Sequence, residues 1–296
     1  MMDVCSADEA GPRQIYIFLL RCRSLENRFL EGELNQIDVD YLDRGEGPVV
    51  ILIHSSVAGA RQWRSLMEYL ADSYRLIAIN LFGYGRTPPW NDNLRQTLAD
   101  QAGLVEKILP KDGTQVRIVG HSFGASVAMK VTALVPDKVK KLVLIEPNPF
   151  YLLEQSGRHA AYAEAVKLRD CIKEAGRTEN WQNAAKEFAN YWNGAGSWES
   201  MSKDRKVKFA ESLKPNFHEF DAVTTPDLSL ADWHSRLPRE TTVISAANTV
   251  RSIREIVELL SAEHPGWKFK TMATGGHMAP LSHPQLVNPI LEEALA

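Results

Sequence analysis

The chain has little of what would assign it to a membrane, disulfide-rich or nucleic-acid-binding class. Its three cysteines, Cys5, Cys22 and Cys171, are scattered and odd in number, so neither a disulfide framework nor a zinc site is indicated. This cysteine use fits a reducing compartment, and we expect a cytoplasmic protein that needs no metal or other cofactor. The net charge of −3 provides no basic surplus for nucleic acid or an anionic membrane.

Long apolar runs are also missing. No segment approaches the ~20 apolar residues of a membrane helix, and the apolar run over residues 15–20 is too short for a signal h-region. A length of 296 residues, with 44% hydrophobic and 24% charged residues, fits one large α/β domain or a core with an inserted subdomain.

One stretch carries a chemical signal. Gly120-His-Ser-Phe-Gly124 follows an apolar strand expected over residues 116–119 and precedes a helix of small residues from Ala125. Gly-x-Ser-x-Gly between a strand and a helix is typical of a nucleophile elbow. Its serine adopts a strained backbone conformation beside glycines that lack colliding Cβ atoms, and the helix N-terminus favours developing negative charge. We predict that Ser122 is a nucleophile; the alternative is a structural serine in a catalytically inactive relative.

Predicted strands alternate with predicted helices along most of the chain. The expected strands cover residues 37–42, 49–54, 75–80, 116–119, 139–145, 242–245 and 267–272. This alternation predicts an α/β fold with a mostly parallel, doubly wound sheet, in which ligands bind at the carboxyl ends of the strands. Ser56, Ser122, Glu146 and His277 all follow predicted strand ends, so we expect them at one edge of the sheet.

The pattern also divides the chain into segments. Residues 1–34 are expected to form an N-terminal extension, partly helical over residues 15–29. Residues 35–150 and 231–296 are expected to form the core. Residues 151–230 have a helical pattern without a convincing strand, which predicts a helical cap subdomain. This segment is rich in aromatic residues: Tyr162, Trp181, Phe188, Tyr191, Trp192, Trp198 and Phe217. At helical spacing such residues more often form the core of a cap than contact substrate.

From about residue 36 onward the chain resembles the α/β-hydrolase superfamily. The matching features are the elbow, the strand end His54-Ser-Ser-Val57, the loop Gly83-Tyr-Gly-Arg-Thr87 and the loop Gly275-Gly-His-Met-Ala-Pro-Leu-Ser-His-Pro284. The resemblance implies an eight-stranded core with a helical cap inserted after the sixth strand. It also implies the chain order nucleophile, acid, histidine.

The resemblance places the catalytic histidine at His277. Acyl transfer needs a base that takes the serine proton and returns it to the leaving group, and imidazole titrates in a suitable range. The alternative is a loop histidine with a structural hydrogen bond. His283, one residue before Pro284, suits a helix-capping or surface role, and His121 is expected to pack away from the nucleophile.

The acid is harder to place. Many α/β hydrolases carry it after the seventh strand, but here residues 246–249 read Ala-Ala-Asn-Thr and no carboxylate occurs before Glu255. Glu146 follows the expected strand over residues 139–145, which the resemblance identifies with the sixth strand of the eight-stranded core. This is similar to the acid position in one branch of haloalkane dehalogenases and in zearalenone-type lactonases. We therefore predict a triad of Ser122, Glu146 and His277.

Other placements of the acid stay open. Glu146 could only cap its strand or contact the cap. The enzyme would then work as a dyad, or through a cap acid such as Asp227 or Asp232.

The resemblance also implies an oxyanion hole. One backbone donor would be the amide of Phe123, which follows the nucleophile. The second would be the amide of Ser56, with Val57 as its neighbour to consider. Relatives often have glycine after the strand-end histidine, whereas this chain has Ser55 and Ser56, whose hydroxyls would narrow or polarise the site.

The predicted function is that of an α/β-fold serine hydrolase that cleaves a carboxylic ester, lactone or thioester through an acyl-enzyme on Ser122. The alternatives are hydrolysis of carbon–carbon bonds, acyl transfer to an acceptor other than water, and a non-catalytic protein that binds a ligand under its cap. The expected partner is a small-molecule acyl substrate, apolar or aromatic, with no nucleic acid or membrane partner. A homodimer stays open.

Overall fold

The computed structural model describes residues 37–296 except residue 92. Residues 39–296 form one compact unit, which contains the sheet and its helices. The predicted extension over residues 1–34, with its predicted helix over residues 15–29, lies outside the described residues.

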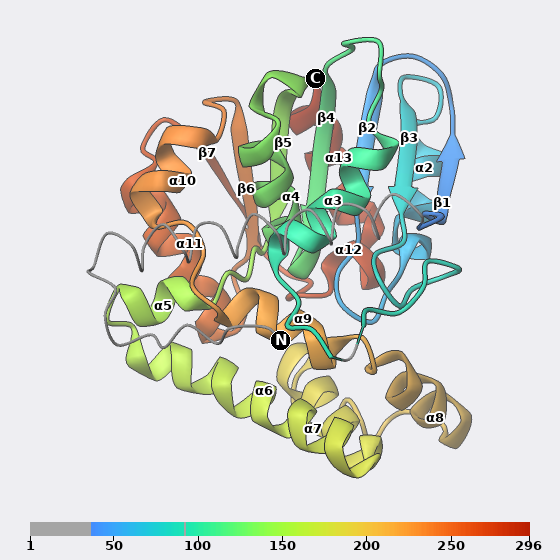
Figure 1. The fold of residues 1–296 in the computed structure, drawn as a ribbon, viewed down its shortest axis with the longest axis vertical. Coiled ribbons are helices and arrows are strands. Elements are labelled where there is room, and N and C mark those ends of the chain that lie inside the picture. Colours follow the sequence, from blue (N-terminus) through green and yellow to red (C-terminus); the bar gives the residue numbers. More distant parts are fainter. Residues whose placement is uncertain (1–36, 92) are drawn as a thin grey trace, which may run out of the picture. The chain divides into compact units, whose positions relative to one another are not determined.

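A single sheet organises this compact unit. In the described residues it has seven strands in the order β1-β3-β2-β4-β5-β6-β7, with β1 antiparallel to β3 and all other pairs parallel (Figure 1). The strands are β1 (Tyr41–Arg44), β2 (Val49–Ile53), β3 (Arg75–Ile79), β4 (Val116–His121), β5 (Val139–Ile145), β6 (Thr241–Ala246) and β7 (Lys268–Met272). Every residue of β2 is buried, as in a parallel strand covered on both faces. The predicted mostly parallel α/β fold is confirmed, with seven described strands instead of the eight that the resemblance implied.

The first strand differs from the prediction. The alternating pattern of residues 37–42 predicted a strand there, but the strand is Tyr41–Arg44. Asp40 accounts for the difference, because its backbone N–H donates to Thr87 Oγ1 and its carboxylate accepts from Asn80 Nδ2. The contact with Thr87 uses the backbone N–H that a strand would direct into its ladder.

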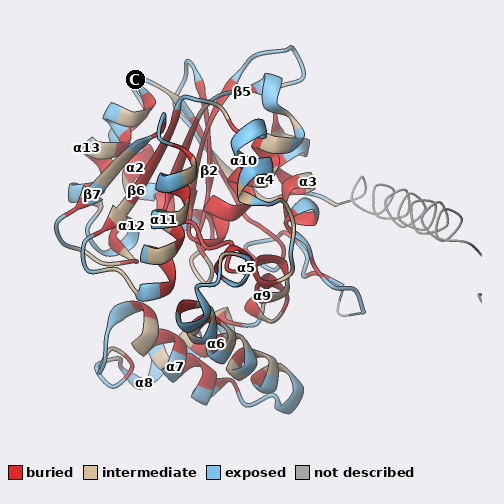
Figure 2. Ribbon diagram, turned by 90° about the vertical axis from the view of Figure 1, so that its left-hand side faces the viewer, coloured by how far each residue is buried: buried red, intermediate tan, exposed pale blue. Residues whose placement is uncertain are grey.

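Helices cover both faces of the sheet. On one face α2 packs with α13, and on the other α3 packs with α4 (Figures 1 and 2). The core helices and 3-10 turns are η2 (Ala60–Trp63), α2 (Arg64–Leu70), α3 (Leu98–Ile108), α4 (Phe123–Leu134), η3 (Pro136–Lys138), α11 (Arg251–Glu263), α12 (Ala279–Ser282) and α13 (Pro284–Leu295). Helix α3 begins at Leu98, because Thr97 and Asp100 form a capping box at its N-terminus.

The connection between β5 and β6 consists of six helices and the turns and loops that join them. Its helices are α5 (Tyr151–Gln155), α6 (His159–Thr178), α7 (Trp181–Asn193), α8 (Lys203–Ser212), α9 (Asn216–Thr224) and α10 (Leu230–Arg236). Helices α6, α7 and α8 lie beyond the end of the sheet toward which the parallel strands run (Figure 1). We refer to the insertion from α5 to α9 as the cap helices.

The elbow brings the backbones of β4, α4 and β2 unusually close together. A Cβ atom on Gly120 would collide with the Gly124 carbonyl, and one on Gly124 would collide with the carbonyls of Ile53 and His54. Both glycines are therefore required by the close approach of the strands and the helix.

We expect Gly124→Ala to lower the free energy of unfolding by about 3 kcal/mol or more, because the obstructing atoms are backbone and cannot rotate away. Urea denaturation would measure the loss. The matched control is Gly266→Ala, whose added Cβ meets open space at an ordinary φ; it should change stability by less than about 1 kcal/mol. Equal effects of the two substitutions would contradict this account of the elbow.

Candidate active site

Backbone strain is concentrated where the sheet ends. The described non-glycine residues with positive φ are Val57 (63°), Ser122 (55°), Glu146 (49°) and Glu179 (56°). The first three follow β2, β4 and β5 at the same edge of the sheet. Such conformations cost of order 1–3 kcal/mol each and persist where surrounding contacts determine them. The serine that the sequence singled out thus has the strained backbone expected of an elbow.

Three side chains named in the sequence analysis form one hydrogen-bonded row. Ser122 Oγ lies 2.9 Å from His277 Nε2, and His277 Nδ1 lies 2.6 Å from Glu146 Oε2. All three residues are buried, Glu146 completely. Because a carboxylate can only accept, the Nδ1 proton donates to Glu146, and Nε2 is left to accept from the Ser122 hydroxyl.

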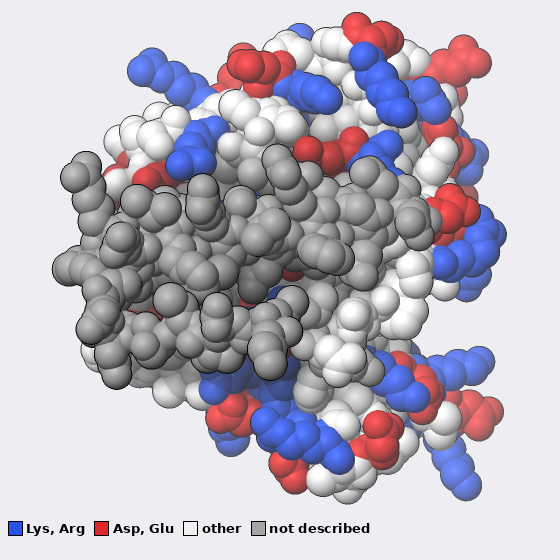
Figure 3. Space-filling model, in the orientation of Figure 1, with Lys and Arg blue, Asp and Glu red and all other residues white. Residues whose placement is uncertain are grey.

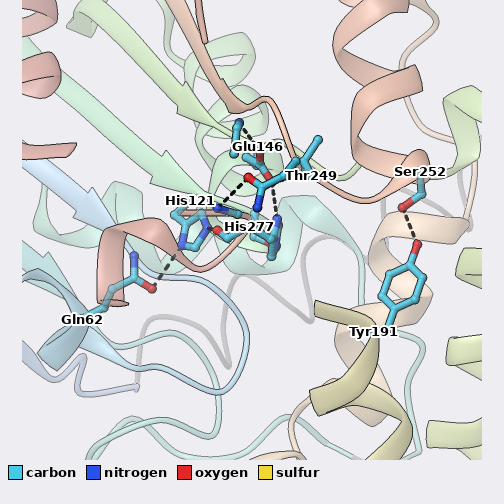
Figure 4. A network of polar contacts seen from close by, with 11 residues as sticks. Gln62, His121, Glu146, Tyr191, Thr249, Ser252 and His277 are labelled. Atoms are coloured by element: carbon cyan, nitrogen blue, oxygen red, sulfur yellow. Dashed lines mark hydrogen bonds and ion pairs between the residues drawn. The ribbon is translucent and has the colours of Figure 1, made fainter. Parts of the chain in front are cut away.

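The segment after β6, which lacks a carboxylate, supports the carboxylate of Glu146 (Figure 4). The backbone N–H of Ala246 donates to Glu146 Oε1 at 2.6 Å, and Thr249 Oγ1 donates to Oε2 at 2.6 Å. Asn248 Oδ1 accepts from the N–H of Gly276, next to His277. Asn248 and Thr249 occupy the segment where many relatives carry the acid; here they instead support Glu146 and the residue before His277, and no sequence motif indicated these contacts.

The other candidate groups lie in different contacts. Asp227 pairs with Lys130 at 2.8 Å, and Asp232 completes the capping box of α10. The exposed His283 contacts the hydroxyl of Ser282.

His121 does more than pack. Its Nε2 lies 2.8 Å from the carbonyl oxygen of His277, and the two rings are 5.1 Å apart. Burial lowers the pKa of His121 well below its usual value, and the nearby His277 lowers it further. The neutral ring therefore donates its Nε2 proton to that carbonyl and fixes the loop that carries His277.

The loop after β2 is held by buried side chains on several sides. Burial lowers the pKa of His54 to about 4, and the neutral ring contacts the Ser55 carbonyl through Nδ1 and accepts from the Leu81 N–H through Nε2. The Ser55 N–H donates to Gln62 Oε1. We call residues 55–57 the oxyanion loop, after the role predicted for it.

Two further bonds bring Glu219 of the cap helix α9 to this loop. Ser56 Oγ donates to Glu219 Oε2 at 2.5 Å, and Tyr84 Oη donates to Glu219 Oε1 at 2.8 Å. Tyr84 Oη in turn accepts from the Val57 N–H at 2.9 Å. Burial raises the pKa of Glu219 to about 7, although the bonds from Ser56 and Tyr84 act in the opposite direction. No motif marked Glu219 in the sequence.

The space above Ser122 is small and enclosed by both the core and the cap. Its volume is about 20 Å³, enough for about one water molecule. Cap residues Phe188, Trp192, Glu219 and Phe220 line it together with Ser122. The Trp192 ring also stacks on His277, with centroids 4.1 Å apart. Of the cap aromatics named from the sequence, Phe188 and Trp192 thus line this space.

Residues 50–290 match the Alpha/beta hydrolase family, and the chain belongs to it. The resemblance inferred from the sequence is therefore confirmed. The match covers most of both halves of the sheet and the cap between them.

Individual relatives are distant. The chain is 23% identical over 261 residues to the (E)-2-((N-methylformamido)methylene)succinate hydrolase of Acinetobacter baylyi, covering 87% of this chain and 94% of that one. It is 29% identical over 141 residues, 47% of its length, to the dihydrolipoyllysine-residue acetyltransferase component of the acetoin cleaving system of Cupriavidus necator, and spans only 37% of that protein. Among solved structures, the enol-lactonase of Burkholderia xenovorans LB400 superposes with a TM-score of 0.67 at 15% identity, covering 88% of this chain and 97% of that one, which shows the shared fold.

Three observations concern other partners. Within residues 37–296, residue 92 apart, no helix is long and apolar enough to cross a membrane, and no group of three or more potential metal-binding side chains occurs. On the face drawn in Figure 3, Lys and Arg side chains of the described residues are interspersed with Asp and Glu.

The raised pKa of Glu219 predicts a pH-dependent effect on stability. Between its usual pKa of 4.5 and about 7, the native state binds more protons at this site than the unfolded state, so stability falls as pH rises through this window. Glu219→Gln removes the titration. The stability of this variant relative to the wild type should therefore rise by a few kcal/mol between pH 4.5 and pH 8, at about 1.4 kcal/mol per pKa unit.

Chemical denaturation of both proteins at the two pH values measures this difference. Comparing the two pH values cancels the hydrogen bonds that the substitution changes at any pH. An offset that is the same at pH 4.5 and pH 8 would contradict the raised pKa.

Proposed function

We propose that the protein is a serine hydrolase that cleaves carboxylic esters, lactones or thioesters through an acyl-enzyme on Ser122. The observation that carries the proposal is the buried row from Ser122 Oγ to His277 Nε2 and from His277 Nδ1 to Glu146. A nucleophile, a base and a group that orients the base, each within hydrogen-bond distance of the next, are the requirements of this chemistry.

In the proposed mechanism His277 takes the proton of Ser122 while Oγ attacks the carbonyl carbon. Glu146 keeps the imidazole in the tautomer that leaves Nε2 free, and it stabilises the imidazolium that forms. His277 then protonates the leaving group, and the acyl group stays on Ser122. A water molecule activated by His277 hydrolyses the acyl-enzyme and releases the acid.

The oxyanion would bind two backbone amides. Phe123 is the first residue of α4, where a backbone N–H has no acceptor within the helix. In the oxyanion loop, the amides of Ser55 and Val57 already donate to Gln62 and Tyr84. This favours Ser56 over Val57 as the second donor.

The lining of the site favours an acyl group that is apolar or aromatic. Phe188, Trp192, Phe220 and Val223 form its apolar wall, and the buried Trp192 Nε1 has no hydrogen-bond partner among the described residues. Since about 20 Å³ does not admit an acyl group, binding requires that cap side chains move.

We expect Ser122→Ala to abolish hydrolysis and Glu146→Gln to lower kcat by about 10³- to 10⁴-fold, because an amide does not stabilise the imidazolium. Steady-state kinetics on an activated ester would measure both. The matched control is Asp227→Asn, which removes a carboxylate paired with Lys130 away from His277. If the control loses its activity while Glu146→Gln keeps it, a cap acid completes the row instead.

A substrate panel tests the class of bond cleaved. Esters, lactones and thioesters of graded acyl size should be hydrolysed, with Ser122→Ala as the blank, and apolar or aromatic acyl groups should be preferred. Product analysis separates hydrolysis from carbon–carbon cleavage and from acyl transfer to an added alcohol or thiol. A fluorophosphonate probe should label Ser122. Absence of both labelling and turnover would favour a ligand-binding protein.

A further inference from the structure

A buried carboxyl of the cap is bonded to the loop that would carry the second oxyanion donor. The Ser56 hydroxyl donates to one oxygen of Glu219, and the Tyr84 hydroxyl donates to the other. Through Tyr84 the contact extends to the backbone N–H of Val57. Glu219 therefore reaches two consecutive residues of the oxyanion loop from a helix more than 160 residues further along the chain.

The environment of Glu219 is unfavourable for a residue with a purely structural role. It is 2% exposed, and among the residues that the structure describes it forms no ion pair. A buried carboxyl without a cation destabilises the folded protein once it ionises. Groups that cost stability and persist are typical of functional sites.

We propose that Glu219 is a positioning residue for the oxyanion hole, which holds the Ser56 amide in place through the Ser56 and Tyr84 hydroxyls. This inference rests on the proposed function. Because Glu219 lies on a cap helix and its partners belong to core loops, the position of this cap helix and the position of the oxyanion loop are coupled.

The backbone of the loop explains why it needs such a hold. Val57, a β-branched residue, has a φ of 63°, a conformation that relaxes unless other contacts fix it. Relaxation at Val57 would shift the amide of the preceding residue, Ser56. A misplacement of about 1 Å can cost about 10²-fold in rate. The raised pKa of Glu219 keeps part of the population neutral near pH 7, which limits repulsion of an adjacent oxyanion.

The test compares four substitutions on the full chain. Glu219→Leu removes both contacts, Glu219→Gln keeps an acceptor for one hydroxyl and a donor to the other, and Ser56→Ala keeps the amide but removes its hydroxyl. Asp221→Asn is the matched control, since Asp221 lies on the same helix and pairs with Lys173 instead of the loop. Each variant is assayed for kcat, KM, affinity for a boronic acid that forms a tetrahedral adduct on Ser122, and melting temperature.

Glu219→Leu should lower kcat and boronic acid affinity by about 10- to 100-fold with KM changed by less than about threefold, because the lost interaction belongs to the tetrahedral state. Glu219→Gln should recover most of this loss. In the Glu219→Leu background, Ser56→Ala should lower kcat and boronic acid affinity further by less than about threefold, because both changes remove the same hydrogen bond. Asp221→Asn should keep kcat.

Several results would overturn the inference. These are an unchanged kcat and boronic acid affinity in Glu219→Leu, fully multiplicative effects of the Ser56 and Glu219 substitutions, or an equal loss in Asp221→Asn. If Glu219→Leu does not fold, a wild-type kcat and boronic acid affinity in Ser56→Ala overturn it, because that variant lacks the hydroxyl that bonds to Glu219. Activity that persists in Ser122→Ala would instead refute the proposed function, whatever the Glu219 variants do.

Discussion

The hydrogen bond between Glu146 and His277 fixes the edge of the sheet at which the candidate active site lies. It joins the end of β5 to the loop after β7, across 131 residues of sequence. A completely buried carboxylate has to be satisfied by donors, and here the donors come from the last residue of β6 and from the connections that follow β6 and β7. Satisfying one carboxylate therefore fixes three neighbouring strand ends relative to each other.

The strained residues follow from the same arrangement. Ser122 and Glu146 end adjacent strands, β4 and β5, and both have positive φ. A regular strand continuation would carry their side chains past the edge of the sheet, whereas the turn directs them to His277 from two sides. The close approach at Gly120 and Gly124 makes the turn at Ser122 sterically feasible. Burial, hydrogen bonding and packing together determine conformations that none of them would maintain alone.

The sequence predicted what depends on local signals. Ser122 and His277 lie in glycine-containing motifs beside predicted strands, and Glu146 follows a strand whose last residues, 142–145, are all apolar, so each could be placed at the sheet edge from the sequence. The predicted bounds of the first strand were wrong because the alternation at residues 37–40 does not reveal that Asp40 bonds to the loop at Thr87. Its register depends on a contact 47 residues away.

Glu219 shows the limit of such prediction more clearly. Helix α9 carries both Glu219 and Asp221, and nothing in the local pattern distinguishes the carboxyl that faces the active site from the one that pairs with Lys173. The distinction arises only when α9 packs over the oxyanion loop. A site formed by both a cap and a core therefore contains residues whose role cannot be predicted from any one segment of the sequence.

Glu146 and Glu219 are both buried, but their environments differ, and the difference matters for the proposed reaction. Glu146 contacts His277, where positive charge forms in the proposed mechanism, and it also accepts from a backbone N–H and a hydroxyl. Glu219 contacts hydroxyls only, and burial raises its pKa. Negative charge beside His277 stabilises an imidazolium, whereas the same charge beside the oxyanion loop would oppose the oxyanion. A cap carboxyl that resists ionisation can thus hold the loop with less electrostatic penalty than an acid of ordinary pKa.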